Sequence, residues 1–251
     1  MSEKKLAWPG SALLGPVSPV LVSCGEGQSA NLITIAWVGT VCTQPPRVSI
    51  SVRPTRHSYG LIRDSGEFVI NLPTVALARA VDWCGVKSGR ELDKFSAMGL
   101  HAAPASKVGC PLLAESPVNL ECRVFQRIEL GSHDLFLADV VAVDVDEALL
   151  DSAGKLHLEK AGLLAYAHGD YYALGKQLGK FGWSVRRKKP GGRKPGAQRG
   201  KDAPGANPRR PQKLNAGGAK IVTAANARFV LFHKWALLFY FAGAARWPSA
   251  A

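Results

Sequence analysis

The stretch NLITIAWVGTVCTQPPRVSISVRPTRHSYGLIRDSGEFVINLP, from Asn31 to Pro73, decides the fold of this chain. Its segments LITIAWV at 32–38, RVSISV at 47–52 and FVINL at 68–72 alternate or run apolar and are rich in β-branched residues. This pattern predicts three strands. The QPP between the first two cannot continue a helix, because proline lacks a backbone donor and holds the preceding residue extended. We therefore expect a tight loop there and a mainly β fold.

A turn rich in guanidinium and hydroxyl groups joins the second strand to a short predicted helix. Thr55 or Ser58 is a suitable cap for this helix, which should end near Gly66. Free amides at a helix start bind phosphate, and arginine adds bidentate donors. The alternatives are a solvated arginine pair and, for His57, an ordinary surface histidine. The turn predicts a phosphate site, whose candidate residues are Ser51, Arg53, Thr55, Arg56, His57 and Ser58.

The clearest hairpin signal is SPVNLECRVFQRIELGSHDLFLADVVAVDVDE at residues 116–147, where a GSHD turn separates two alternating segments. Together with PVSPVLVSC at 16–24, it brings the total to about six strands. Two short helices are predicted, over 74–85 and, on the surface, over 91–99. This order favours a closed or split antiparallel barrel over a doubly wound fold. No GxGxxG follows a strand, so a Rossmann site for nicotinamide is excluded.

Taken in order, these segments resemble the flavin reductase-like, FMN-binding split-barrel family, in particular its flavoredoxin-like branch. The family's N-[LAM]-x-T-x-[AS]-W strand, D/Q-P-P turn, S-[IV]-x-R-x-[ST]-R-x-[ST] turn and F-x-[IV]-N-[LI]-P strand stand here as NLITIAW, TQPP, SISVRPTRHS and FVINLP. PVSPVLVSCG and GDYYALGKQLGKFGWSVRRK also look like the family's first strand and closing segment. The resemblance covers residues 9–188 and implies an antiparallel FMN-binding split β-barrel with short helices.

The resemblance also implies where the cofactor binds. Asn31, Leu32, Ile33 and Thr34 would form the strand at the flavin edge, with backbone amides meeting the ring and the Thr34 hydroxyl as an extra donor. The SVRPTRHS turn would hold the phosphate, and Tyr171 would line the open face. The alternatives are a solvent-facing Thr34 and a Tyr171 that only packs in the core. No catalytic residue and no metal ligand is assigned.

The function implied by the resemblance is an NAD(P)H-dependent reductase of flavin or of a small acceptor, with hydride transfer to flavin N5. NADH or NADPH would stack directly on the bound FMN. A non-catalytic FMN electron carrier that serves a protein partner is the alternative, and a membrane-associated protein with a vestigial barrel is a third. The family also implies a homodimer.

Cysteine usage indicates a reducing cytoplasm. Five cysteines lie far apart without a CxxC pair, so they form neither a disulfide framework nor a zinc site. The LVSC segment that ends at Cys24 mimics a lipoprotein cleavage site. Prolines interrupt the apolar stretch before it, whereas a leader needs a continuous apolar run. We therefore expect no export.

The charge of the chain is concentrated at its C-terminal end. The formal net charge is +13, yet residues 186–251 alone hold 15 Lys/Arg and one acid, Asp202. Residues 1–188 are expected to form the flavin reductase-like domain, and 189–251 a disordered, basic, Gly/Pro-rich tail. Its apolar run from Trp235 to Ala245 is too short to span a bilayer. The tail is a dispensable extension, a membrane-surface or partner-docking segment, or a nucleic-acid arm, while the barrel itself should not bind nucleic acid.

A chain that ends at Lys189 should keep its fold, its oligomeric state and its affinity for flavin, because the tail cannot bury a core. Size-exclusion chromatography and flavin titration of both chains measure this. Any salt-dependent binding to anionic vesicles or nucleic acid should disappear with the tail. Loss of soluble protein on truncation would contradict the prediction.

Overall fold

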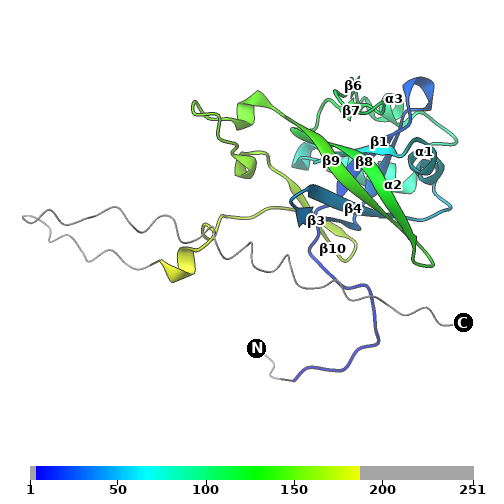
Figure 1. The fold of residues 1–251 in the computed structure, drawn as a ribbon. Coiled ribbons are helices and arrows are strands. Elements are labelled where there is room, and N and C mark those ends of the chain that lie inside the picture. The colour runs from blue at the N-terminus through cyan, green and yellow to red at the C-terminus, as the bar shows by residue number, and fades with distance from the viewer. Residues whose placement is uncertain (1–3, 187–251) are drawn as a thin grey trace, which may run out of the picture. The chain divides into compact units, whose positions relative to one another are not determined.

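The structure is a computed structural model that describes residues 4–186, so the predicted tail at 189–251 lies outside the described residues. Seven strands form one antiparallel sheet in the order β2-β1-β5-β8-β9-β4-β3 (Figure 1). Their bounds are β1 Val20–Cys24, β2 Asn31–Ile35, β3 Val38–Thr43, β4 Pro46–Val52, β5 Glu67–Asn71, β8 Val118–Glu129 and β9 Asp134–Val145. The prediction of a mainly β, antiparallel fold is confirmed.

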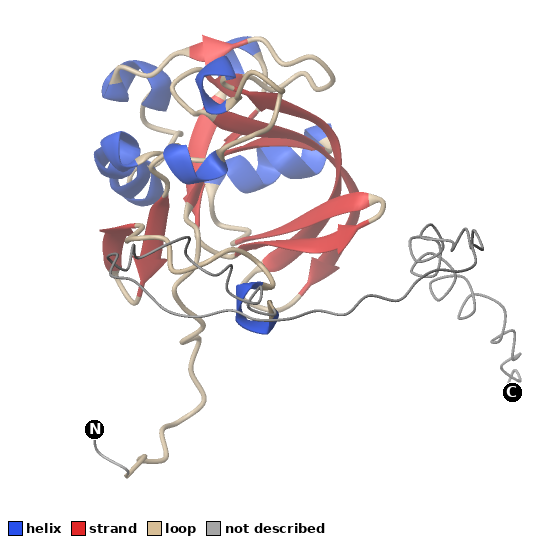
Figure 2. Ribbon diagram, turned by 90° about the vertical axis from the view of Figure 1, so that its left-hand side faces the viewer, coloured by secondary structure: helices blue, strands red, loops and turns tan. Residues whose placement is uncertain are grey.

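The sheet curls into a half-barrel because its two edge strands are consecutive in sequence. β2 and β3 lie at opposite ends of the strand order, yet only Ala36 and Trp37 separate them. The Trp37 carbonyl accepts a hydrogen bond of 2.9 Å from the backbone N–H of Ser51 in β4. So short a link brings the two edges together, and the curved strands are visible in Figure 2.

The main sheet has one strand more than the six expected. The segment 32–38, predicted as a single strand, breaks at Ala36 and Trp37 into β2 and β3. The 116–147 hairpin is confirmed as β8 and β9, whose register shifts between Glu121 and Cys122 and between Val124 and Gln126. Such bulges increase the local twist. Two small sheets add β6 Ala102–Ala103 with β7 Leu112–Leu113, and β10 Leu164–Ala167 with β11 Asp170–Ala173.

The helices largely follow the sequence pattern. α1 runs over His57–Ser65 and ends, as predicted, at Gly66, whose φ of 67° suits glycine. Its cap is Arg56, without a side-chain hydrogen bond, so the caps predicted at Thr55 or Ser58 were wrong. The other helices are α2 Ala78–Val86 and α3 Lys94–Met98, with 3₁₀ turns η1 Gly27–Ser29, η2 Val75–Leu77, η3 Glu147–Leu149, η4 Leu158–Lys160 and η5 Trp183–Val185. Within residues 4–186, no helix is long and apolar enough to cross a membrane.

Alternate residues of the sheet pack on its two faces. Val22, Ile50 and Phe68 belong to a cluster that draws on six strands and α1 and fills the inside of the half-barrel. Leu21 and Leu32 belong to a second cluster, together with residues of α2 and α3. All five side chains are fully buried, and each contributes about 1.5–3 kcal/mol by leaving water. These two clusters fix β2 between the barrel interior and the helices.

A buried carboxylate holds the loop before β7 on the outside of the sheet. Glu121 has no solvent exposure and accepts hydrogen bonds from the backbone N–H groups of Ser106, Lys107 and Val108 and from the Ser106 hydroxyl. Burial alone would raise the pKa of Glu121, but these donors outweigh it and hold that pKa below its ordinary value. Glu121 therefore stabilises the fold as a carboxylate.

Glu121→Gln should lower the free energy of unfolding at pH 7 by about 1–3 kcal/mol, because an amide NH₂ would face donors. Since the folded pKa is depressed, the contribution of Glu121 is present at neutral pH and is lost as the pH falls through that pKa. Urea unfolding of parent and variant measures the difference. Glu147→Gln, at an exposed position, is the matched control and should unfold like the parent. Equal stability of all three proteins would show that the Glu121 carboxylate does not hold the loop before β7 in place.

Candidate functional site

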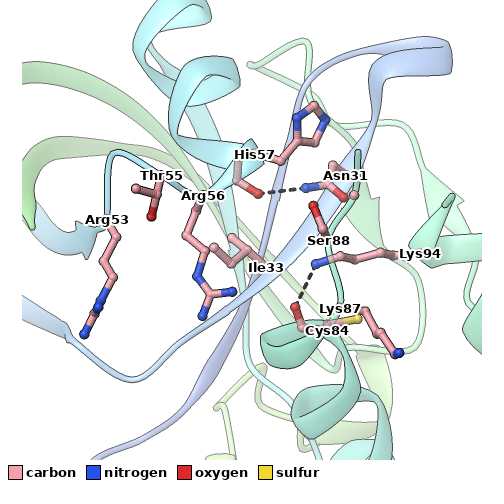
Figure 3. A pocket seen from close by; sticks show the side chains of 12 residues that line it. Asn31, Ile33, Arg53, Thr55, Arg56, His57, Cys84, Lys87, Ser88 and Lys94 are labelled. Carbon is pink, nitrogen blue, oxygen red and sulfur yellow. Dashed lines mark hydrogen bonds between the residues drawn. The ribbon is translucent and has the colours of Figure 1, made fainter. Parts of the chain in front are cut away.

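A cavity of about 540 Å³ opens where β2, the start of α1 and the loop from α2 to α3 meet (Figure 3). Basic and hydroxyl side chains dominate its wall, and no Asp or Glu side chain lines it. The lining residues are Asn31, Ile33, Arg53, Thr55, Arg56, His57, Ser58, Cys84, Lys87, Ser88, Gly89 and Lys94. Such a wall attracts an anion.

One wall is the turn that leads from β4 into α1. The Arg56 N–H donates to the Arg53 carbonyl over 3.0 Å, which closes the turn. No side chain caps α1, so the amides of its first turn remain available to a ligand. Within residues 4–186, neither guanidinium enters an ion pair or a side-chain hydrogen bond, and both are exposed. Free amides beside free guanidiniums form an anion site.

A buried hydrogen bond ties this wall to the sheet edge. Asn31, the first residue of β2, donates from Nδ2 to the Ser58 Oγ over 2.7 Å (Figure 3). Both residues are at most 3% exposed. The opposite wall also packs against Asn31, since a Cβ at position 89 would overlap the Asn31 Oδ1. Asn31 therefore sets the spacing between the two walls.

Lys94 is a buried lysine that the sequence placed on the surface. It is only 3% exposed, and its Nζ donates to the Cys84 carbonyl over 2.7 Å. Burial lowers the pKa of Lys94, and the charge of Arg56 acts in the same direction. The helix expected on the surface over 91–99 forms as α3 and exposes Ser96 and Ala97, but Lys94 and Phe95 at its start pack inward. Figure 3 shows the Lys94 amine pointing into the cavity.

A smaller cavity, of about 130 Å³, continues along β2 toward Trp37. It shares Ile33, Arg53 and Arg56 with the first, so the two form one cleft. The side of β2 that faces away from β1 pairs with no other strand of the described range. His133, in the hairpin turn, lies at the end of this cleft. Burial, followed by the charge of Arg53, lowers the pKa of His133 and keeps the ring neutral at pH 7.

A second buried hydrogen bond joins α1 to the hairpin that carries His133. The Tyr59 hydroxyl donates to the Asp134 Oδ2 over 2.5 Å, and Arg127 donates to the Tyr59 oxygen over 2.7 Å. Tyr59 follows Ser58 of the anion wall, and Asp134 follows His133. Tyr59 and Asp134 are at most 7% exposed. The hydrogen bonds among Tyr59, Asp134 and Arg127 therefore connect the anion wall at one end of the cleft to the hairpin turn at the other.

The structure brings most of the predicted site residues together. Seven of them line the larger cavity: Asn31, Ile33, Arg53, Thr55, Arg56, His57 and Ser58. Thr34 and Ser51 line the smaller one, although the Thr34 hydroxyl already donates to the Val81 carbonyl. Leu32 and Tyr171 line neither, because both pack in the cluster under α2 and α3. Burial, followed by the charges of Arg90 and Lys94, lowers the pKa of His57.

Several lining residues escaped the sequence analysis. Those with polar or small side chains outside β2 and β4 are Cys84, Lys87, Ser88, Gly89, Lys94 and His133. Lys94 follows Asp93, which caps α3, but no pattern separates it from a surface lysine. His133 stands in the GSHD turn, where a solvated histidine is the ordinary expectation. Only the packing of distant segments places these residues beside β2.

The thiol in the cavity wall is inert. All five cysteines are free, and burial raises the pKa of Cys84, in the cavity wall, to about 11. At neutral pH this thiol stays protonated and cannot act as a nucleophile. Within residues 4–186, no three His, Cys, Asp or Glu side chains gather in a way that could hold a metal ion. The groups that the cleft itself offers are basic side chains, hydroxyls and a free strand edge.

Comparison with known proteins identifies the family. The sequence profile of the flavin reductase like domain matches residues 15–175, which is more than half of the chain. This chain belongs to the flavin reductase-like family. The resemblance noted from the motifs is confirmed, and the cleft along β2 is the candidate flavin site of this family member.

Solved structures confirm the split-barrel fold. Flavoredoxin of Desulfovibrio vulgaris (Miyazaki F) superposes with a TM-score of 0.68 at 30% identity, over 73% of this chain and 100% of its own. An FMN-binding protein from Thermus thermophilus gives 0.60 at 27% identity, over 72% and 98% of the two chains. An NADPH-flavin oxidoreductase of Streptomyces viridifaciens is 30% identical over 50% of this chain and 65% of its own length.

Proposed function

We propose that this protein binds FMN and works as an NAD(P)H-dependent reductase of flavin or of a small acceptor. The observation that carries the proposal is the cleft that joins the anion wall of α1 to the free edge of β2. A flavin mononucleotide has a dianionic end and a planar ring with a polar edge. The cleft offers groups for both in one continuous space.

The described residues fit the cofactor. Arg53, Arg56 and Ser58, with the free amides of α1, suit the phosphate, and Lys94 is a buried basic residue on the opposite side of the cavity. The backbone of Asn31 to Thr34 suits the polar edge of the ring, because this strand edge has no other partner in the described range. The Thr34 hydroxyl is engaged by Val81, so we assign the ring contacts to the backbone.

The protein's own task in the reaction is to hold and orient. Bound FMN supplies the N5 atom that accepts a hydride. The hydrogen bonds from Asn31 to Ser58 and from Tyr59 to Asp134 fix the walls of the cleft around the cofactor. A neutral His133 at the far end of the cleft exchanges hydrogen bonds without adding charge. A nicotinamide that stacks on the exposed ring face is then positioned by the ring itself.

A non-catalytic electron carrier is the second candidate, and the superposition with a flavoredoxin favours it. In that case FMN would exchange electrons with a protein partner and would not react with nicotinamide. For both candidates we propose a homodimer, as the family resemblance implies. We also propose a cytoplasmic location, where buried free thiols stay reduced.

The purified full chain decides between the two candidates. We expect a yellow protein whose flavin absorbance bleaches within seconds when NADH or NADPH is added without oxygen. A flavin that only dithionite reduces would reject the reductase and support the carrier. A colourless protein that binds no added FMN would reject both.

Arg53→Ala or Arg56→Ala should weaken FMN binding roughly ten- to a hundredfold, because a charge-assisted contact to phosphate contributes about 1.5–3 kcal/mol. Lysine at either position should give an intermediate loss, since it restores the charge but not the fork geometry. Fluorescence-quenching titration at fixed salt measures the affinities.

Riboflavin, which lacks the phosphate, is the ligand control and should bind parent and variants alike. Arg63→Ala is the matched protein control, because Arg63 lies in the last turn of α1 and pairs with Asp64. It should leave both affinities unchanged. If the Arg53 and Arg56 variants keep full FMN affinity, or lose riboflavin equally, the phosphate does not bind here.

A further inference from the structure

The larger cavity carries more basic groups than one FMN phosphate needs. Arg53, Arg56, Lys87 and Lys94 line it, and no carboxylate does. The phosphate of FMN carries about two negative charges at neutral pH. About two basic side chains therefore remain. Figure 3 shows that Lys87 and Lys94 lie across the cavity from the arginines.

Lys87 belongs to a loop, residues 87–90, that also carries Arg90 and is held in place. Gly89 sits so close to Asn31 that an added Cβ would overlap the Asn31 side chain. The Arg90 N–H donates to the Ser88 Oγ over 3.3 Å and closes the loop on itself. Because Asn31 is buried at the start of β2, the loop is fixed against the sheet edge. Lys87 lines the cavity from this loop, and Arg90 is exposed next to the lining residue Gly89.

Neither exposed base of this loop is committed elsewhere. Within residues 4–186, Lys87 and Arg90 take part in no ion pair and no side-chain hydrogen bond. The nearby Asp93 carboxylate accepts from the backbone of Phe95 and Ser96 as the cap of α3. The charge of Arg90 also reaches the cavity, because it helps to lower the pKa of His57.

We propose that Lys87 and Arg90 bind a phosphate group of a second nucleotide, which docks against the FMN in the cleft. The inference rests on the FMN site proposed above. Lys94 is buried and faces the space that FMN would fill, whereas Lys87, in the cavity wall, and Arg90, on the same loop, are exposed. A ligand that approaches from outside and extends past the flavin would reach both.

Two phosphate-containing groups of a nicotinamide dinucleotide have the required chemistry. One is the ribose 2′-phosphate, which NADPH carries and NADH lacks. The other is the pyrophosphate, which the two donors share. In either case the loop acts as a binding element for the electron donor and takes no part in hydride transfer.

Steady-state reduction of the FMN-loaded full chain separates these sources. Lys87→Ala and Arg90→Ala should each raise KM about three- to tenfold with little change in kcat, since exposed charge contacts contribute modestly. A rise for NADPH alone assigns the loop to the 2′-phosphate. An equal rise for NADPH and NADH assigns it to the pyrophosphate. Unchanged KM values for both donors in the double variant would overturn the proposal.

The matched control is Lys155→Ala, which removes one exposed positive charge on a loop that lines none of the cavities described above. It should behave like the parent. Every variant keeps the basic residues 186–251, so differences between variants report the loop and not the C-terminal charge. FMN affinity should stay at the parent value in Arg90→Ala, because Arg90 does not line the cavity.

An equilibrium measurement keeps the inference separate from the reductase function. Adenosine 2′,5′-bisphosphate is titrated calorimetrically into parent and double variant, with and without added FMN. If the parent binds it and the variant binds about tenfold more weakly, the phosphate subsite stands even when no donor reduces the flavin. Equal binding by parent and variant, or none by either, would overturn the subsite while leaving the FMN site intact.

Discussion

The two-residue link between β2 and β3 is the constraint on which the rest of the structure depends. Ala36 and Trp37 join strands that lie at opposite edges of a seven-stranded sheet. A flat sheet would hold those edges roughly 25–30 Å apart, since neighbouring strands are about 4.8 Å apart. The sheet must therefore curl to bring β2 toward β3 and β4. The N–H of Ser51 donates to the carbonyl of Trp37 just before the β3–β4 pairing and holds the link against β4. The free edge of β2 is the floor of the cleft.

Buried polar side chains give that cleft its dimensions. Asn31 contacts Ser58 of α1 on one side and approaches Gly89 of the opposite loop on the other. Tyr59 and Asp134 connect α1 to the hairpin turn that carries His133. A buried polar group without its partner costs about 1–3 kcal/mol, so each of these contacts resists displacement. The walls are set by pairs of residues that lie 27 and 75 positions apart in the sequence.

Local patterns in the sequence predict the strands, the long hairpin, the end of α1 at Gly66 and the basic turn, because each follows from adjacent residues. The break at Ala36 and Trp37 was missed, since an apolar run gives no sign that its two halves pair with different neighbours. Lys94 and His133 were missed for a related reason. Their burial results from segments that meet only in the folded chain, and a lysine after a helix cap and a histidine in a turn look like solvated residues.

The crowding of positive charge around Lys94 links cofactor loading to protons. Burial lowers the pKa of Lys94 and that of His57 below their ordinary values. The charge of Arg56 acts in the same direction on Lys94, and the charge of Arg90 does so on His57. A bound dianion reverses the charge part of that effect and raises both pKa values. Linkage then requires that anion binding near the pH where these groups titrate draws protons from the solvent. For a ligand that remains a dianion, the pocket would bind more tightly as the pH falls through the range in which Lys94 and His57 titrate, so the ambient pH would change its occupancy.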